Sequence, residues 1–128
     1  MLKTKCILLP KNYSDGKRIS IMSRHTLNDG ITPDERIDKN LYDEWRRKFA
    51  PPLKLVGDYY RGLSWEEFEK RYLDYLGTIN QKIKELVETA SSKDITLLCV
   101  EESPERYHRR LLAKECKRIK PKLEILIN

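Results

Sequence analysis

The sequence lacks the cysteine pattern of a secreted, disulfide-stabilised protein. Its three cysteines are odd in number, widely separated and without a C-x-x-C pair, which argues against both a disulfide framework and a cysteine-rich zinc site. The sequence also lacks any apolar run near the roughly 20 residues of a membrane span, and its N-terminal apolar stretch is too short for a signal peptide. We therefore expect a soluble cytoplasmic protein with no membrane association.

Positive charge exceeds negative charge. The formal net charge is +6, from 26 Lys and Arg residues against 20 Asp and Glu residues. Such a charge attracts anionic partners over long range, among them phosphate-bearing small molecules and nucleic acids. The 128 residues are enough for one domain, and the 39% of hydrophobic residues can supply its core. We expect a single domain over residues 1–128.

Four segments have the apolar runs or the alternation typical of β-strands: residues 4–9, 18–23, 95–100 and 123–127. The uninterrupted run ITLLCV at 95–100 is typical of a strand covered on both faces, so we place it at the centre of the sheet. The first two strands are joined by residues 10–17, which contain the turn signal Asp15-Gly16. Because so short a segment cannot hold a helical crossover, these two strands are antiparallel if they are neighbours.

Apolar residues at helical spacing predict four helices, at about residues 41–49, 65–76, 79–90 and 104–119. Ser64 and Glu67 form a capping box at the start of the second, and Ser103-Pro104 is a favourable start for the fourth. The order of elements predicts an α/β fold: a three-layer open sheet of about four strands, mostly parallel with an antiparallel edge strand, and helices on both faces. Ligands of such sheets bind beyond the carboxyl ends of the parallel strands, which selects the loops after residues 23 and 99.

The loop after residue 99 carries groups that are capable of catalysis. Cys99 ends a strand close to a predicted helix start and to basic side chains, which are the surroundings of a nucleophilic thiol. His108 and Glu102 are candidate proton carriers, and Arg106 and Arg109 are candidate ligands of an anion at the helix start. Other roles stay open, since Cys99 could be a small buried core residue and His108 a packed, hydrogen-bonded one.

The loop after residue 23 carries a second charged group, which consists of Arg24, His25, Asp29 and Asp34. If the strands that precede the two loops pair in parallel, this group approaches the residues after 99 and forms a mixed-charge pocket. Such a pocket indicates function better than any one side chain, and we predict that these four residues bind the substrate. Their spacing matches no recognised metal pattern, so we predict no metal site, and the residues indicate no particular cofactor.

Three blocks of the sequence carry a family resemblance: SRHTLNDGITPDERI, FAPPLKLVGDYYRG followed by SWEEFEKRYLDYL, and TLLCVEESPERYHRRLLA. Together they resemble the bacterial and archaeal family known as domain of unknown function 488, over nearly the whole chain. The resemblance implies a compact α/β fold and no particular reaction. In the family's typical last block a second Cys precedes the His-Arg pair, and here Tyr107 stands in its place, which disfavours a two-thiol or metal-thiolate mechanism.

These features are consistent with three alternative functions. Our leading hypothesis is a small cytoplasmic enzyme that acts on a phosphate-bearing or nucleotide-like anion at the carboxyl edge of the sheet. The alternative is a non-catalytic nucleic-acid-binding module that uses the basic face of helix 104–119; that face comprises Arg106, Arg110, Lys114, Lys117 and Arg118. In the third, the protein is a structural homodimer with Tyr59 and Tyr60 in its interface, although these tyrosines could instead rim the cleft.

Overall fold

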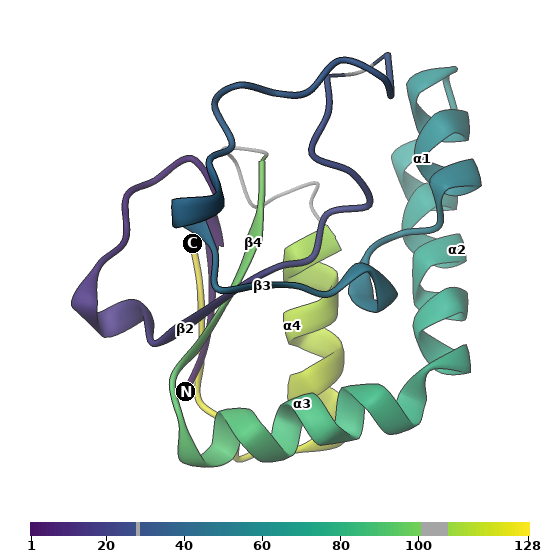
Figure 1. Cartoon of the computed structure of the whole chain (residues 1–128). Coiled ribbons are helices and arrows are strands. Elements are labelled where there is room, and N and C mark those ends of the chain that lie inside the picture. Colours follow the sequence, from purple (N-terminus) through teal and green to yellow (C-terminus); the bar gives the residue numbers. More distant parts are fainter. Residues whose placement is uncertain (28, 101–107) are drawn as a thin grey trace.

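The apolar segment at 95–100 forms the central strand of a parallel sheet (Figure 1). The computed structural model describes residues 1–27, 29–100 and 108–128. Within these ranges the strand order is β3-β2-β4-β1-β5, and every strand pair is parallel. The strands are β1 (Leu2–Cys6), β2 (Lys17–Ser20), β3 (Glu44–Trp45), β4 (Ile95–Cys99) and β5 (Ile125–Ile127). The predicted α/β class is confirmed, with five strands in place of about four.

The prediction that the first strand is an antiparallel edge strand is wrong. β1 lies inside the sheet, between β4 and β5, and is parallel to both. The prediction assumed that the first two strands are neighbours, but Leu2 of β1 and Lys17 of β2 pair with Ile95 of β4 from opposite sides. The short connection from β1 to β2 therefore passes across β4, and no reversal between adjacent strands is needed.

Four α-helices cover one face of the sheet (Figure 1): α1 (Leu53–Tyr60), α2 (Trp65–Thr78), α3 (Asn80–Ser92) and α4 (His108–Ile119). α4 packs directly on β1, β4 and β5, and α2 and α3 pack on α4. All four helices share one hydrophobic core with the strands. None of the helices within the described ranges is long and apolar enough to cross a membrane.

The two helices predicted in the middle of the chain are confirmed as α2 and α3. α2 begins at its predicted cap, where the Ser64 hydroxyl accepts a hydrogen bond from the Glu67 N–H at 3.2 Å. Its buried residues are Phe68, Tyr72 and Leu76, which recur at helical spacing. The local sequence therefore determined both where this helix begins and which face it buries.

The helix predicted at 41–49 does not form. The segment consists of two short 3-10 helices, η2 (Lys39–Leu41) and η3 (Arg47–Phe49), with β3 between them. Trp45 pairs with Ser20 of β2, and its indole N–H donates to the carbonyl oxygen of Met22 at 2.6 Å. These tertiary contacts override the helical spacing of the apolar residues. The prolines expected to end this helix instead lead into α1, which the sequence reasoning missed.

The opposite face of the sheet carries the 3-10 helix η1 (Tyr13–Asp15) and a second, smaller apolar cluster that includes Ile7, Met22 and Leu98. We call it the polar face because it also carries buried charged and hydroxyl side chains. Arg18 of β2 is fully buried there and donates to the Asp15 carboxylate at 2.6 Å and to the carbonyl oxygens of Leu9 and Leu41 at 2.9 and 2.7 Å. Thr96 of β4 donates to the Asp15 carbonyl oxygen at 2.7 Å. Helical segments thus lie on both faces, with the α-helices on one and the 3-10 helix η1 on the other.

Asp15 keeps its charge although it is buried. Burial raises the pKa of its carboxyl group, but hydrogen bonds from the Asn12 N–H, Arg18 and Lys5 outweigh burial and hold the pKa below its ordinary value. Lys5 of β1 contributes an ion pair at 3.1 Å. One carboxylate thus connects β1 and β2 across the polar face.

Candidate functional site

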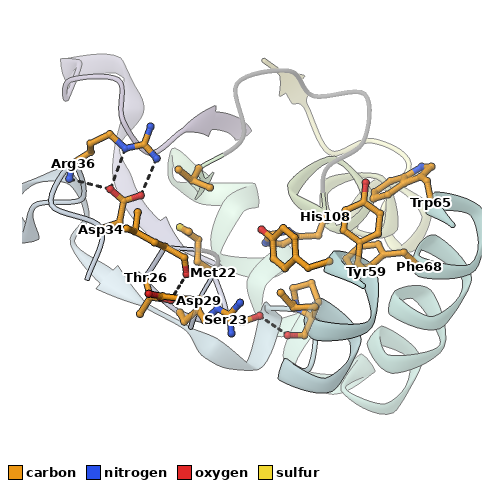
Figure 2. A pocket seen from close by; sticks show the side chains of 16 residues that line it. Met22, Ser23, Thr26, Asp29, Asp34, Arg36, Tyr59, Trp65, Phe68 and His108 are labelled. Carbon is orange, nitrogen blue, oxygen red and sulfur yellow. Dashed lines mark hydrogen bonds and ion pairs between the residues drawn. The ribbon is translucent and has the colours of Figure 1, made fainter. Parts of the chain in front are cut away.

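A cavity of about 540 Å³ lies at the carboxyl edge of the sheet, which is where open α/β sheets bind ligands. Its lining comes from the loop after β2, from Val100 after β4, from α1 and α2, and from the first residue of α4. Figure 2 shows the charged loop residues on one side and the aromatic side chains with His108 on the other. The volume falls in the range of roughly 300–1,000 Å³ that is typical of small-molecule sites.

The loop after β2 folds into a small hairpin that forms the charged side of the cavity. Thr26 and Pro33 make an isolated antiparallel bridge. The Asp29 carboxylate closes the turn, because its Oδ1 accepts from the N–H groups of Ile31 and Thr32, each at 2.9 Å. The hydrogen bond from the Thr32 hydroxyl, followed by these two, lowers the pKa of Asp29. Asp29 is therefore ionised, and it stabilises the hairpin in which it lies.

Gly30 in the hairpin turn makes room for Arg24. Its φ is +75°, and a Cβ at this position would lie 2.5 Å from Nη1 of Arg24. The guanidinium group therefore lies against the turn, where its charge also lowers the pKa of Asp29. Because Arg24 lines the cavity, the glycine helps to determine where this positive charge lies.

Asp34 and Arg36 form a bidentate ion pair beside the hairpin (Figure 2). Nε and Nη2 of Arg36 donate to the two carboxylate oxygens of Asp34 at 3.0 and 2.9 Å. The side-chain hydrogen bonding from Arg36 lowers the pKa of Asp34, although burial opposes it. Both residues line the cavity, so the candidate ligand Asp34 lies at the cavity together with an arginine that the sequence reasoning did not select.

His25 anchors the loop to the sheet and does not line the cavity. Its ring stacks on Trp45 with centroids 3.7 Å apart, and its Nε2 lies 2.8 Å from the Ser20 hydroxyl. Burial lowers the pKa of His25 to about 4, and the charge of Arg47 adds to this effect, while Asp34 opposes it. His25 is therefore neutral at pH 7, and its charge does not support the predicted role in binding an anion.

His108 lies between the cavity and the sheet. It lines the cavity with 8% of its surface exposed, and its Nε2 is 2.8 Å from the carbonyl oxygen of Ile21. Because a carbonyl oxygen can only accept, Nε2 carries the hydrogen, and gain or loss of a proton takes place at Nδ1. The Tyr72 ring packs edge-on against the imidazole. These contacts hold the ring in one orientation, as a proton carrier requires.

Four aromatic residues line the cavity, and we call them the aromatic wall: Tyr59, Tyr60, Trp65 and Phe68. Tyr59, Trp65 and Phe68 lie across the cavity from the hairpin (Figure 2). Trp65 and Phe68 are stacked with ring centroids 5.1 Å apart. Phe68 belongs to the core, whereas Tyr60 is 51% exposed. Sequence reasoning placed Tyr59 and Tyr60 either at the cleft or at an interface, but it assigned Trp65 and Phe68 to helix packing alone. The missed signal was that α1 and the start of α2 carry aromatic residues in quick succession.

Cys99 and Arg109 contact each other, and neither is among the described residues that line the cavity. Nη1 of Arg109 donates to Sγ of Cys99 at 3.0 Å, and both side chains are fully buried. Arg109 also donates to the carbonyl oxygen of Asn128 at 3.2 Å. A nucleophile or an anion ligand must be accessible to its substrate, so we assign neither residue a role at the cavity, and packing explains the position of Cys99.

Glu102 and Arg106 lie outside the described residues, as does the predicted start of the last helix at residue 104. Of the candidate site residues, the structure therefore brings Arg24, Asp29, Asp34 and His108 together around one cavity. Within the described ranges, no three His, Cys, Asp or Glu side chains gather closely enough to bind a metal ion.

The basic face of α4 is partly engaged in contacts within the chain. Arg118 donates to Glu115 at 2.9 Å, and Lys117 donates to the carbonyl oxygen of Leu123 at 2.6 Å. Lys114 is exposed. Because a nucleic-acid interface needs several cations directed at phosphates, these contacts give no support to the alternative in which α4 binds DNA or RNA.

Comparison with known proteins identifies the family of the chain. No match was found among curated proteins or among solved structures. Residues 2–118 match the family model DUF488-N3a, described as the active DUF488-N3 subclade. The matched range contains every residue that lines the cavity, and it agrees with the resemblance to the family of domain of unknown function 488. The chain therefore belongs to the active DUF488-N3 subclade.

Proposed function

We propose that this protein is a small enzyme that acts on a phosphate-bearing, nucleotide-like anion bound in the cavity at the carboxyl edge of the sheet. The observation that carries the proposal is that Arg24, the aromatic wall and His108 surround one cavity. The family match adds support, since the matched subclade is described as active. The sheet topology supports it as well, because ligands of open α/β sheets bind at this edge.

In this proposal Arg24 binds the phosphate group. A guanidinium group presents several N–H donors in one plane, and these match the oxygens of a phosphate. The hairpin turn at Gly30 holds the guanidinium beside the cavity. The aromatic wall then contacts the organic part of the substrate and keeps water away from it.

His108 transfers the proton in the reaction. Its Nε2–H is bound to the carbonyl oxygen of Ile21, so Nδ1 is the atom that accepts or releases the proton. A positioned acid or base contributes about 10²- to 10⁴-fold to a rate. Asp29 and Asp34 support the hairpin and its neighbouring ion pair and take no proton, since the pKa of each lies below its ordinary value.

A screen of phosphate monoesters, phosphodiesters and nucleotides with the purified protein tests this function. We expect turnover of at least one class, and a loss of about 100-fold or more in kcat for His108→Gln. Glutamine is suited to this test because its amide nitrogen can replace Nε2 as the donor to Ile21, while no titratable Nδ1 remains. Arg24→Ala should raise KM, because the phosphate loses a charged partner.

Lys114→Ala is the matched control, since it removes one exposed cation from α4 at a distance from the cavity lining. It should leave kcat and KM unchanged. Circular dichroism and thermal melting of each variant establish that it is folded. Absence of turnover with every substrate class, or full activity in His108→Gln, contradicts the proposal.

A further inference from the structure

The aromatic wall exposes more aromatic surface than core packing requires. Phe68 is buried and joins the wall to the core, while Tyr59 and Trp65 are only partly buried against that core, and Tyr60 is 51% exposed. Exposed apolar surface that lines a concave site is typical of ligand binding. Aromatic side chains in such a position bind planar rings, and every nucleobase offers a planar π-face.

The charged side of the cavity limits how many negative charges a ligand can carry. Among the described lining residues, the arginines Arg24 and Arg36 face the aspartates Asp29 and Asp34. Both aspartates have a pKa below the ordinary value and are ionised, and Arg36 is bound by both carboxylate oxygens of Asp34. The charge of Arg24 in turn lowers the pKa of Asp29, so the two arginines are balanced by two ionised aspartates. These described lining residues have no excess of positive charge, which matches a single phosphate group better than a chain of phosphates.

From these two sides of one cavity we infer that the ligand is a nucleoside monophosphate, whose base lies against the aromatic wall and whose phosphate is bound by Arg24. This inference rests on the proposed function and narrows its substrate class. Asp29 of the hairpin lies across the cavity from Tyr59 and Trp65 (Figure 2). Arg24 lies against the turn of the same hairpin at Gly30, so the ligand needs a spacer between ring and phosphate. The ribose of a nucleotide supplies that spacer.

Calorimetric titration of the purified protein with a set of related probes tests the inference. The set contains the four ribonucleoside 5′-monophosphates, their nucleosides and triphosphates, ribose 5-phosphate and pyridoxal 5′-phosphate. We expect at least one monophosphate to bind about tenfold or more tightly than ribose 5-phosphate, because stacking on aromatic residues adds to the phosphate contact. The corresponding triphosphate should bind more weakly than the monophosphate, since Asp29 and Asp34 repel its additional charges.

Variants of the wall and of Arg24 separate the two halves of the inference. Tyr59→Leu should weaken monophosphate binding by about tenfold and leave ribose 5-phosphate binding unchanged, whereas Tyr59→Phe should restore most of the affinity. Arg24→Ala should weaken the binding of both the monophosphate and ribose 5-phosphate and leave the binding of the nucleoside unchanged. Tyr13→Leu is the matched control, because Tyr13 is fully exposed on η1 and does not line the cavity.

Tryptophan fluorescence gives an independent readout of ring stacking. The chain has two tryptophans, of which Trp65 lines the cavity and Trp45 does not. The monophosphate should quench the emission of the native protein, and the quenching should be lost in Trp65→Phe, in which Trp45 is the remaining fluorophore. Quenching that persists in Trp65→Phe contradicts stacking at the wall.

The outcomes distinguish this inference from the proposed function. If ribose 5-phosphate binds as tightly as all four monophosphates, or pyridoxal 5′-phosphate binds more tightly than any of them, the nucleotide assignment is overturned while phosphate binding at Arg24 stands. If nucleosides bind and quench but Arg24→Ala has no effect on any phosphate, the phosphate-bearing substrate of the proposed function fails and only the stacking of a base survives. If no probe binds, both are overturned.

Discussion

The two faces of the sheet are held by different chemistry, although the same strands contribute to both. On the helical face, Ile19, Ile95 and Leu97 pack into one apolar core with all four α-helices. On the opposite face, Arg18 and Asp15 form a buried ion pair beside a smaller apolar cluster that includes Leu98. Apolar packing is non-directional and tolerates small adjustments, whereas a buried ion pair depends on specific partners in a specific geometry.

The cavity lies where these two faces meet at the carboxyl edge. Its aromatic wall continues the apolar face, because Phe68 is part of the helical core. Its hairpin continues the polar face, because His25 binds Ser20 of β2 and stacks on Trp45. A site that can bind both a ring and a charge thus arises where an apolar layer and a polar layer end side by side.

Replacing Arg18 with methionine should have the largest effect on the polar face. The variant leaves the Asp15 carboxylate buried without this cation, and it removes the donors to the carbonyl oxygens of Leu9 and Leu41. Removing one partner of a buried pair costs about 3–5 kcal/mol. Chemical denaturation at pH 7 measures the loss in the free energy of unfolding.

The pH dependence of that loss separates ion pairing from simple packing. In the native protein the lowered pKa of Asp15 stabilises the fold above its unfolded pKa of 3.8, and this contribution is lost as pH falls further. Arg18→Met loses the part of this contribution that Arg18 supplies, while the Asn12 N–H and Lys5 still lower the pKa of Asp15. Its deficit in the free energy of unfolding should therefore shrink as pH falls below about 4. Leu97→Ala on the helical face should cost about 2–5 kcal/mol at every pH. If the free energy of unfolding of Arg18→Met lies below that of the native protein by the same amount at every pH, the charge of Arg18 does not order the polar face.

His25→Gln tests the link between the polar face and the hairpin. Folding lowers the pKa of His25 from 6.5 to about 4. The neutral imidazole should therefore stabilise the native protein fully above pH 6.5, and this stabilisation should be lost progressively as the pH falls towards 4. With allowance for solvent screening, we expect this loss to lower the free energy of unfolding by about 1–2 kcal/mol. The free energy of unfolding of His25→Gln should be less sensitive to pH in this window. Equal pH dependence in both proteins would mean that another group causes it.

Gly30→Ala should have the smallest effect on stability and a local effect on binding. The added Cβ would lie 2.5 Å from the Arg24 guanidinium, and the backbone φ of +75° disfavours any side chain; the expected cost is about 1 kcal/mol. Ribose 5-phosphate should bind several-fold more weakly, while nucleoside binding is retained. Gly77→Ala is the control, since a Cβ there meets no atom within 4 Å. Its expected result is unchanged binding and a slightly more stable α2.

Sequence reasoning was most successful where structure depends on neighbouring residues. It identified α2 from Ser64 and the apolar residues that follow at helical spacing, and β4 from an uninterrupted apolar run. It failed at Trp45, where helical spacing predicted a helix but pairing with Ser20 formed a strand. It also failed for β1, whose neighbours in the sheet come from the far end of the chain.

The residues of the candidate site likewise fall into those that the sequence predicted and those that it did not. The rule that ligands bind at the carboxyl edge selected Arg24, Asp29, Asp34 and His108, which line the cavity. The same rule also selected Cys99, but the direction of a side chain at the end of a strand determines whether it faces a cavity or the core. Arg36, Trp65 and Phe68 were missed as site residues because their position at the cavity depends on how the hairpin and the helices pack against the sheet.

By itself, the sequence determined the α/β class and the family, along with α2, which begins at a local cap, because periodicity, capping and motif order are properties of nearby residues. Only the tertiary structure decided the strand order, the burial of Cys99 beside Arg109 and the meeting of a charged hairpin with an aromatic wall. These features depend on contacts between distant residues, such as His108 and Ile21, which lie 87 positions apart. No local pattern encodes such a pairing, since it is selected by the packing of the whole chain.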